Sequence, residues 1–142
     1  MDNICTNQPF LLLMQTSKSI QEVIRDEMTK NKLSVTEFAV LEVLFQHGKQ
    51  NIQQIGSRIL ISSGSMTYVI DKLEKRGLLC RNDCPEDRRI IHVTLTHDGI
   101  QLMKGIMPKH QELVDDLFSS LSGDEVETII TLLKKVKSKV EA

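Results

Sequence analysis

Apolar residues recur at intervals of three and four over most of this chain, and this spacing predicts a mainly α-helical protein. The first such stretch runs from Phe10 to Met28 and favours one helix with a single apolar stripe. Ser34 stands three residues before Glu37, which is the spacing of a capping box, so a second helix is expected to begin there. Gly48 is expected to end that helix, because glycine readily adopts the conformation that follows a helix.

Two shorter helices are expected to follow. The first fits 52–59, with Ile55 facing inward. The second is expected to be capped by Ser62 or Ser63 and to be stopped by Gly77. Its buried stripe is formed by apolar residues at helical spacing, namely Met66, Val69, Ile70 and Leu73. Two short helices in this order are typical of a helix-turn-helix.

The hydrophobic period then falls to two, which indicates strands. A short strand is expected over 79–81, and a second one where Ile91, Val93 and Leu95 alternate with polar residues. The segment between the two strands is NDCPEDRR, a polar turn that contains a proline. The sequence therefore predicts a β-hairpin with a charged tip, which would make the helix-turn-helix a winged one.

Helical spacing returns after the hairpin. Thr96 is expected to cap a long helix that reaches Leu121. Pro108 is expected to interrupt and kink this helix, because proline lacks a backbone donor and clashes with the preceding turn. Ser122 and Glu125 form another capping box, which predicts the start of a last helix with one apolar stripe.

These elements predict a mainly α fold with a small β-hairpin wing. We expect an N-terminal dimerisation helix at 1–33, a winged helix-turn-helix DNA-binding domain at 34–96 and C-terminal dimerisation helices at 97–142. The outer helices are long and striped. We therefore expect them to bury their apolar faces against those of a second copy across a two-fold axis, which would make the protein a homodimer.

The composition narrows the class of protein. The chain has 142 residues, of which 40% are hydrophobic and 26% charged, and this suits one globular domain with arms. No apolar run approaches the ~20 residues of a membrane span, and the first residues lack the basic region of a secretory signal. The three cysteines are an odd and sparse set, so free thiols and a cytoplasmic location are expected rather than a disulfide scaffold.

The net charge of -1 excludes a histone-like protein that binds nucleic acid through bulk charge. It does not exclude a protein whose basic groups are local. Such a group bunches in the expected DNA-binding domain: Lys72, Lys75, Arg76, Arg81, Arg88 and Arg89.

The outer face of the fourth helix carries side chains that suit DNA. Short polar groups let a helix approach the major groove closely, and hydroxyl and lysine groups bond base edges or phosphates. The candidates for DNA contact are Ser63, Ser65, Thr67, Tyr68 and Lys72. The alternative interpretation is a solvated helix face with ordinary helix-start serines.

The hairpin tip places Arg88 and Arg89 directly after Asp87. A bare arginine at a wing tip suits the narrow minor groove, whose negative potential attracts a guanidinium. Asp87 would hold that arginine through a charge-assisted hydrogen bond. A solvated charged turn is the alternative. The helix face and the tip occur on the expected elements of one chain, so the two signals reinforce each other.

Three segments resemble the MarR family of winged-helix regulators, namely LSVTEFAVLEVLFQHG, IGSRILISSGSMTYVIDKLEKRGLLCR and CPEDRRIIHVTLTHDG. The match spans 33–99, with helical arms in the family order on both sides. Its most specific pieces are the phrase VIDKLEKRGL and the wing motif D-x-R…V-x-L-T, supplied by Asp87, Arg89, Val93, Leu95 and Thr96. Among the family's groups, the segments look most similar to the MhqR-like one, which is associated with responses to quinones and phenolic electrophiles.

The resemblance implies a homodimer that binds a pseudo-palindromic operator in double-stranded DNA, usually as a repressor. It implies that Arg89 enters the minor groove and that Asp87 orients it. It also implies that the polar residues of the fourth helix are recognition contacts, and that Asp71 braces arginines of the wing or helix rather than touching DNA.

For regulation, the resemblance implies release of DNA by a small aromatic or quinone-type compound or by oxidation of a cysteine. A pocket for a flat compound would have to be drawn from residues that are otherwise core or dimer contacts: Phe10, Met14, Phe38, Phe45, Met103 and His110. Cys5 and Cys84 are the candidate redox sensors. For Cys5 the favoured interpretation is an inert terminal thiol, because no basic residue lies close in sequence to lower its pKa. Cys84 is expected to be exposed beside the wing tip.

Cys80 and Cys84, with His92 and His97 nearby, suggest a zinc site, but the C-x3-C spacing is loose and a wing must stay free for DNA. We therefore expect no metal and no cofactor, and Cys80 is expected to be a small buried filler. His47 is expected to end the second helix, where its charge suits the negative pole.

Two other classes of function compete with a DNA-binding regulator. A winged-helix module that binds only another protein fits the near-neutral charge, whereas the arginine wing and the polar helix face argue against it. An enzyme is not expected, because the chain has no Gly-rich phosphate loop, no HExxH motif and no nucleophile in a recognisable turn.

Overall fold

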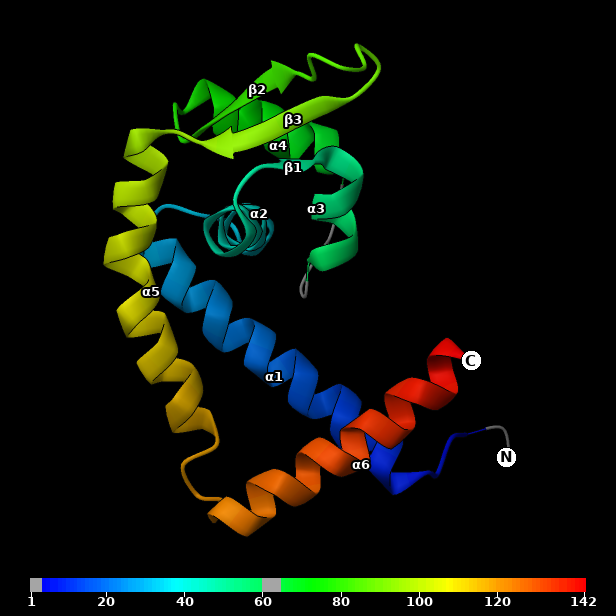
Figure 1. The fold of residues 1–142 in the computed structure, drawn as a ribbon. Coiled ribbons are helices and arrows are strands. Elements are labelled where there is room, and N and C mark those ends of the chain that lie inside the picture. Colours follow the sequence, from blue (N-terminus) through cyan, green and yellow to red (C-terminus); the bar gives the residue numbers. More distant parts are fainter. Residues whose placement is uncertain (1–3, 60–64) are drawn as a thin grey trace. The chain divides into compact units, whose positions relative to one another are not determined.

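The computed structural model describes residues 4–59 and 65–142 (Figure 1). The helices in these residues are α1 (Gln8–Lys30), α2 (Val35–His47), α3 (Ile52–Arg58), α4 (Met66–Lys75), α5 (His97–Leu117) and α6 (Gly123–Glu141), and the strands are β1 (Gln50–Asn51), β2 (Leu79–Asp83) and β3 (Ile91–Leu95). The expected order of helices and hairpin is therefore confirmed, and so is the mainly α class with a small wing. The chain divides into two compact units, 1–105 and 106–142, with the boundary inside α5.

Local signals begin and end the first two helices. Asn7 accepts a hydrogen bond from the Phe10 amide at 2.9 Å and so caps α1. The capping box of α2 is confirmed, because the Ser34 hydroxyl accepts the Glu37 amide at 3.0 Å and the Glu37 carboxylate accepts the Ser34 amide at 2.8 Å. Gly48 follows α2 with a φ of +72°, a conformation that glycine adopts without strain.

The core of the first unit is built around α2, which packs against α1, α3, α4 and β3. Eight residues of α2 are buried, so it is covered on nearly every side. The largest fully buried side chains include Leu41 of α2 itself and residues of the elements around it: Met28, Ile55, Ile70, Leu73, Leu79, Val93 and Met103. The inward position expected for Ile55 is confirmed.

Helix α4 begins later than its sequence suggested. The expected caps, Ser62 and Ser63, lie outside the described residues, and the N-cap position belongs to Ser65. Gly77 ends the helix region as predicted, with a φ of +75° and with its amide donating to the Glu74 carbonyl at 2.9 Å. Of the expected stripe, Val69, Ile70 and Leu73 are buried, whereas Met66 is half-buried at the start of the helix.

The wing is part of a three-stranded antiparallel sheet of order β1-β3-β2. Strand β2 is two residues longer than the expected 79–81, and β1 has no counterpart in the sequence analysis. Val93 lies opposite Arg81 on one side and Gln50 on the other, and it is fully buried. Ile91, nearer the tip, is 38% exposed. The alternation therefore holds where the sheet covers the core and fails beyond it.

Helix α5 begins at the expected cap, because the Thr96 hydroxyl accepts the Gly99 amide at 3.1 Å. The helix runs without a break through Pro108, so the expected interruption was wrong, and it ends at Leu117, before Leu121. The expected kink stays a prediction. A capping box formed by Ser122 and Glu125 starts α6 as predicted. None of the helices in residues 4–59 and 65–142 has the length and apolarity to cross a membrane.

Candidate nucleic-acid interface

Helix α4 has one buried face and one polar face. Thr67, Tyr68 and Lys72 are exposed, and Tyr68 exposes 67% of its surface. Ser65 is exposed at the N-cap, where its side chain makes no capping hydrogen bond, so its hydroxyl stays available to a ligand. Ser63 lies outside the described residues. The described part of the predicted contact set therefore shares one accessible surface.

A buried carboxylate ties the end of α4 to α2. Arg76 donates from Nη1 to Oε2 of Glu37 at 3.3 Å, and the Glu37 side chain is only 4% exposed. The other carboxylate oxygen of Glu37 serves the capping box with Ser34. One residue thus fixes the start of one helix and the end of another. Sequence reasoning found the capping box but missed Arg76, since nothing local indicates a partner 39 positions away.

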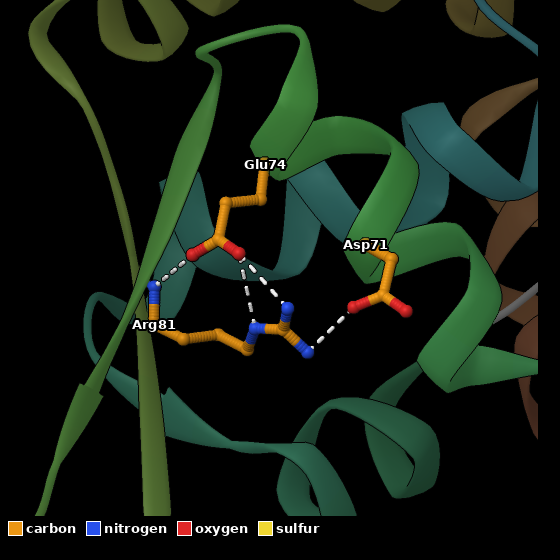
Figure 2. Close-up of polar contacts among 3 residues, drawn as sticks. All are labelled: Asp71, Glu74 and Arg81. Atoms are coloured by element: carbon orange, nitrogen blue, oxygen red, sulfur yellow. Dashed lines mark hydrogen bonds and ion pairs between the residues drawn. The ribbon is translucent and has the colours of Figure 1, made fainter.

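A second link joins α4 to β2 through Arg81 (Figure 2). Nη1 of Arg81 lies 2.6 Å from Oδ1 of Asp71, and Nε and Nη2 donate to Oε1 of Glu74 at 3.3 and 2.9 Å. The backbone amide of Arg81 donates to Oε2 of Glu74 at 2.9 Å. This backbone bond, and then the guanidinium, lowers the pKa of Glu74, and the Glu74 carboxylate raises the pKa of Arg81. Asp71 thus contacts a wing arginine, while the role of Glu74 was missed by the sequence analysis.

The wing tip holds an arginine in the open. Arg89 donates to the Asp87 carboxylate from its amide at 3.0 Å, from Nε at 3.1 Å and from Nη2 at 3.2 Å. These bonds, the side-chain ones first, lower the pKa of Asp87. The Arg89 side chain is nevertheless 90% exposed, and Arg88 beside it is exposed as well. The tip therefore presents an oriented, solvent-accessible guanidinium.

A hollow of about 220 Å³ lies between the start of α3 and the base of the wing tip. Its lining combines polar groups of the helix-turn-helix with the wing: Asn51, Ile52, Gln53, Arg89, Ile90 and Ile91. Arg89 and the first helix of the motif therefore border the same concave surface.

Two cysteines differ from expectation, since Cys80 was expected to be buried and Cys84 to be exposed. Cys5 is exposed near the N-terminus. Cys84, expected to be exposed, is buried, because its amide donates to the Ile90 carbonyl at 3.0 Å and this contact closes the wing loop around it. Cys80 is half-buried with Sγ 3.3 Å from the Thr94 hydroxyl. Among the described residues, no three side chains of the metal-binding types converge on one point.

The residues named for an effector pocket occupy different environments. Phe38 and Met103 are buried in the first unit, whereas Phe10 and Met14 expose 51% and 55% of their surface. Phe45 is half-buried, and His110, in the second unit, is buried. Neither unit, taken by itself over its described residues, encloses the set in one cavity, so the pocket stays a prediction.

Both outer helices carry uncovered apolar side chains. The N-terminal half of α1 exposes a run of large residues, Phe10, Leu11, Leu12, Leu13 and Met14. Helix α6 has no buried residue, and it exposes Ile130, Leu132, Leu133, Val136 and Val140. Apolar surface of this extent is characteristic of an interaction site.

Comparison with known proteins gives consistent results. Residues 33–91 match the model of the MarR family. The chain is 44% identical to the HTH-type transcriptional regulator MhqR of Bacillus subtilis over 127 residues, which cover 89% of this chain and 88% of that protein.

Two solved structures share the fold. BpsR of Bordetella bronchiseptica, whose DNA binding is regulated by 6-hydroxynicotinic acid, is 27% identical with a TM-score of 0.80 and covers 92% of this chain and 99% of its own. A mutant MarR from E. coli complexed with operator DNA has a TM-score of 0.81 at 23% identity, over 96% and 99% of the two chains.

These relatives are transcriptional regulators and not enzymes, and their similarity extends over both the winged unit and the outer helices. The winged helix-turn-helix, the polar face of α4 and the arginine tip agree with that relationship. The chain therefore belongs to the MarR family of DNA-binding transcriptional regulators.

Proposed function

We propose that two copies of this chain bind a pseudo-palindromic operator and repress transcription until a chemical signal releases the DNA. The observation that carries this proposal is the pairing of two accessible groups on one compact unit: the polar face of α4 and the guanidinium of Arg89. A helix of this kind suits the major groove, and an exposed arginine suits the adjacent minor groove.

The contacts divide into two kinds. Thr67, Tyr68 and Lys72 of α4 would meet base edges and phosphates, together with Ser65 at the helix start and Ser63 before it. Arg88 and Arg89 would meet the minor groove and its phosphates. Phosphate contacts fix the position of the protein on DNA, and base contacts supply sequence specificity.

The homodimer is supported by the uncovered apolar faces. An amphipathic helix such as α6, with no residue buried in its own chain, has its stripe left for another molecule. A second copy supplies a matching stripe under two-fold symmetry. Two recognition helices would then meet half-sites about 34 Å apart, one turn of DNA.

Release by a small compound is supported by one relative and by the family resemblance. DNA binding by BpsR is regulated by 6-hydroxynicotinic acid, an aromatic acid. Similarity to MhqR accords with the resemblance to the quinone-responsive group. A coupling of only ~1–3 kcal/mol between effector and DNA binding would suffice for regulation. A thiol trigger would act most directly through Cys5, because the burial of Cys84 shields it from an oxidant.

A fluorescence-anisotropy titration of the protein on DNA from its own promoter tests the proposal. We would repeat it with a methyl-substituted benzoquinone and hydroquinone, using the wild-type protein and a variant with its three cysteines changed to serine. A duplex of the same length and base composition in scrambled order is the control.

Tight and selective binding supports the DNA-binding role. Release of both proteins by the compound indicates a non-covalent effector, whereas release of the wild type alone indicates a cysteine sensor. If the protein binds the promoter and no compound weakens that binding, the repressor role still stands but a quinone is not its signal. No selective binding would overturn the proposal in favour of a module that binds another protein.

A further inference from the structure

The wing hairpin is attached to α4 at two places. The first is the tight turn between Lys75 and Leu79, where Gly77 adopts a φ of +75°. The second is Arg81, whose guanidinium and backbone amide are both bonded to carboxylates of α4 (Figure 2). A turn alone leaves a strand free to swing about its end. A second attachment two residues into β2 adds to the packing of β3 on α2 and ties the strand itself to the helix.

The carboxylate of Glu74 binds both the backbone and the side chain of Arg81. One oxygen accepts the backbone amide of Arg81, and the other accepts from its guanidinium. Strand β2 is at the edge of the sheet, so an amide that points away from β3 needs a partner outside the sheet. Glu74 supplies that partner, and it therefore holds the main chain of the wing and not only a mobile side chain.

Arg81 lies at a level of the hairpin that is anchored in the core. Its cross-strand partner Val93 is fully buried and also pairs with Gln50 of β1. Beyond this level two further pairs between β2 and β3, Asn82–His92 and Asp83–Ile91, precede the tip, and His92 also pairs with Asn51 of β1. The direction in which the tip projects therefore depends on the contact of Arg81 with α4 together with the packing of β3 on α2.

The charges of the cluster do not favour DNA. Asp71 and Glu74 contribute two negative charges and Arg81 one positive charge, so the cluster has a net charge of -1 on the helix that also presents Lys72. A negative cluster near phosphates lowers the affinity for any DNA sequence. Any contribution of the cluster to DNA binding must therefore come from the geometry that its hydrogen bonds impose and not from its charge.

We propose that Glu74 is a positioning residue for operator recognition, which, beside the expected brace Asp71, holds Arg81 so that the polar face of α4 and the guanidinium of Arg89 reach their two grooves together. This inference rests on the proposed function, since it concerns the same DNA-binding surface. It predicts that an acidic residue favours operator binding, whereas repulsion between its charge and the phosphates alone would weaken that binding.

Glu74→Gln tests the proposal, because it removes one negative charge and weakens the bonds to Arg81 while keeping the side-chain shape. Glu86→Gln is the matched control. Glu86 is exposed in the wing turn, and the described residues offer it no hydrogen bond or ion pair, so this variant removes the same charge without breaking a contact. Each full-length protein would be titrated on the promoter duplex and on a scrambled duplex of equal length and composition.

Positioning and charge predict opposite results for Glu74→Gln. We expect the promoter affinity to fall by about tenfold, within the loss expected for removing a specific arginine contact, while affinity for the scrambled duplex holds or rises. Glu86→Gln is expected to raise the affinity for both duplexes alike. If Glu74→Gln instead binds the promoter as tightly as Glu86→Gln does, the inference is overturned. If the wild type itself does not prefer the promoter, the proposed function falls first.

Two further measurements separate positioning from simple destabilisation. Hydroxyl-radical footprinting of Glu74→Gln is expected to lose protection of the flanking minor groove while central protection persists. Arg81→Lys keeps the charge but not the planar fork that bonds two carboxylates, so it is expected to share the loss of selectivity. Loss of the whole footprint in step with a lowered Tm, or wild-type selectivity in Arg81→Lys, would contradict the proposal.

Discussion

Asp87 and Arg89 form a closed contact at the wing tip, in which the carboxylate of Asp87 accepts the backbone amide, Nε and Nη2 of Arg89. The contact orients the guanidinium without covering it, since 90% of the Arg89 side chain is exposed. An arginine that is held but uncovered loses less conformational entropy on binding than a freely rotating one.

Arg89→Ala is expected to weaken promoter binding by ~1–3 kcal/mol while leaving the protein folded, because the side chain packs against nothing in the core. An anisotropy titration at physiological salt measures the loss, and circular dichroism confirms the fold. Arg25→Ala is a matched control, since Arg25 is exposed on α1. If both variants lose the same promoter affinity, the effect is due to net charge alone. If Arg89→Ala loses no affinity, Arg89 does not contact the DNA.

Lys72→Ala is expected to reduce affinity for promoter and scrambled duplexes alike. If Lys72 meets a phosphate, it releases about one counterion, so the slope of log K against log salt should fall by ~0.9. Titrations at several salt concentrations measure that slope. An unchanged slope with lowered promoter affinity would indicate a base contact, and an unchanged affinity would exclude contact with DNA.

The sequence predicted best those features whose two partners are close together in the chain. The capping boxes of Ser34 with Glu37 and of Ser122 with Glu125 join residues three apart, and the structure contains both. Gly77 likewise marks the end of α4 by a purely local preference.

Features that depend on distant partners were missed. Strand β1 is two residues long and exists only because Gln50 meets Val93, so no periodicity indicates it. The partner of Arg76, Glu37, is on another helix. Cys84 was expected to be exposed because its neighbours in sequence are polar, but the closure of the loop by Ile90 buries it. Which side chains contact DNA depends on the shape and sequence of the DNA, so the protein sequence alone does not determine these contacts.

The N-caps of α2 and α4 predict a contrast in stability. Ser34 caps α2 with a side-chain hydrogen bond, so Ser34→Ala is expected to lower the free energy of unfolding by ~1 kcal/mol. Ser65 makes no such bond, and Ser65→Ala is expected to change it by only a few tenths of a kcal/mol. Urea unfolding followed by circular dichroism compares them. A large destabilisation by Ser65→Ala would show that its hydroxyl serves the helix and is not reserved for DNA.

Two glycines of α5 predict opposite effects of the same substitution. A Cβ at Gly99 would collide with the backbone carbonyl of Leu78, which also accepts the Thr96 amide at 3.1 Å and so cannot easily move. Gly99→Ala is therefore expected to destabilise the protein by ~1–3 kcal/mol. Gly105 meets nothing within 4 Å of its added Cβ, so Gly105→Ala is expected to stabilise the protein by ~0.4–1 kcal/mol. Equal thermal shifts in both variants would contradict the close approach of α5 to the turn after α4.

The bonds from Arg81 to Glu74 predict a pH dependence of stability. They lower the pKa of Glu74 in the folded state, so unfolding takes up a proton only when the pH is low. The contribution of this carboxylate is therefore complete above the ordinary glutamate pKa of about 4.3 and is lost as the pH falls through the lower, folded-state value.

The difference in unfolding free energy between the wild type and Glu74→Gln should accordingly be constant from neutral pH down to about pH 5 and should shrink below about pH 4.3. Urea denaturation of both proteins at a series of pH values measures this difference, and comparing the two cancels the titration of every other group that they share. A difference that instead widens on acidification would mean that Glu74 is more easily protonated when folded. That result would contradict an attachment of the wing to α4 through an ionised carboxylate.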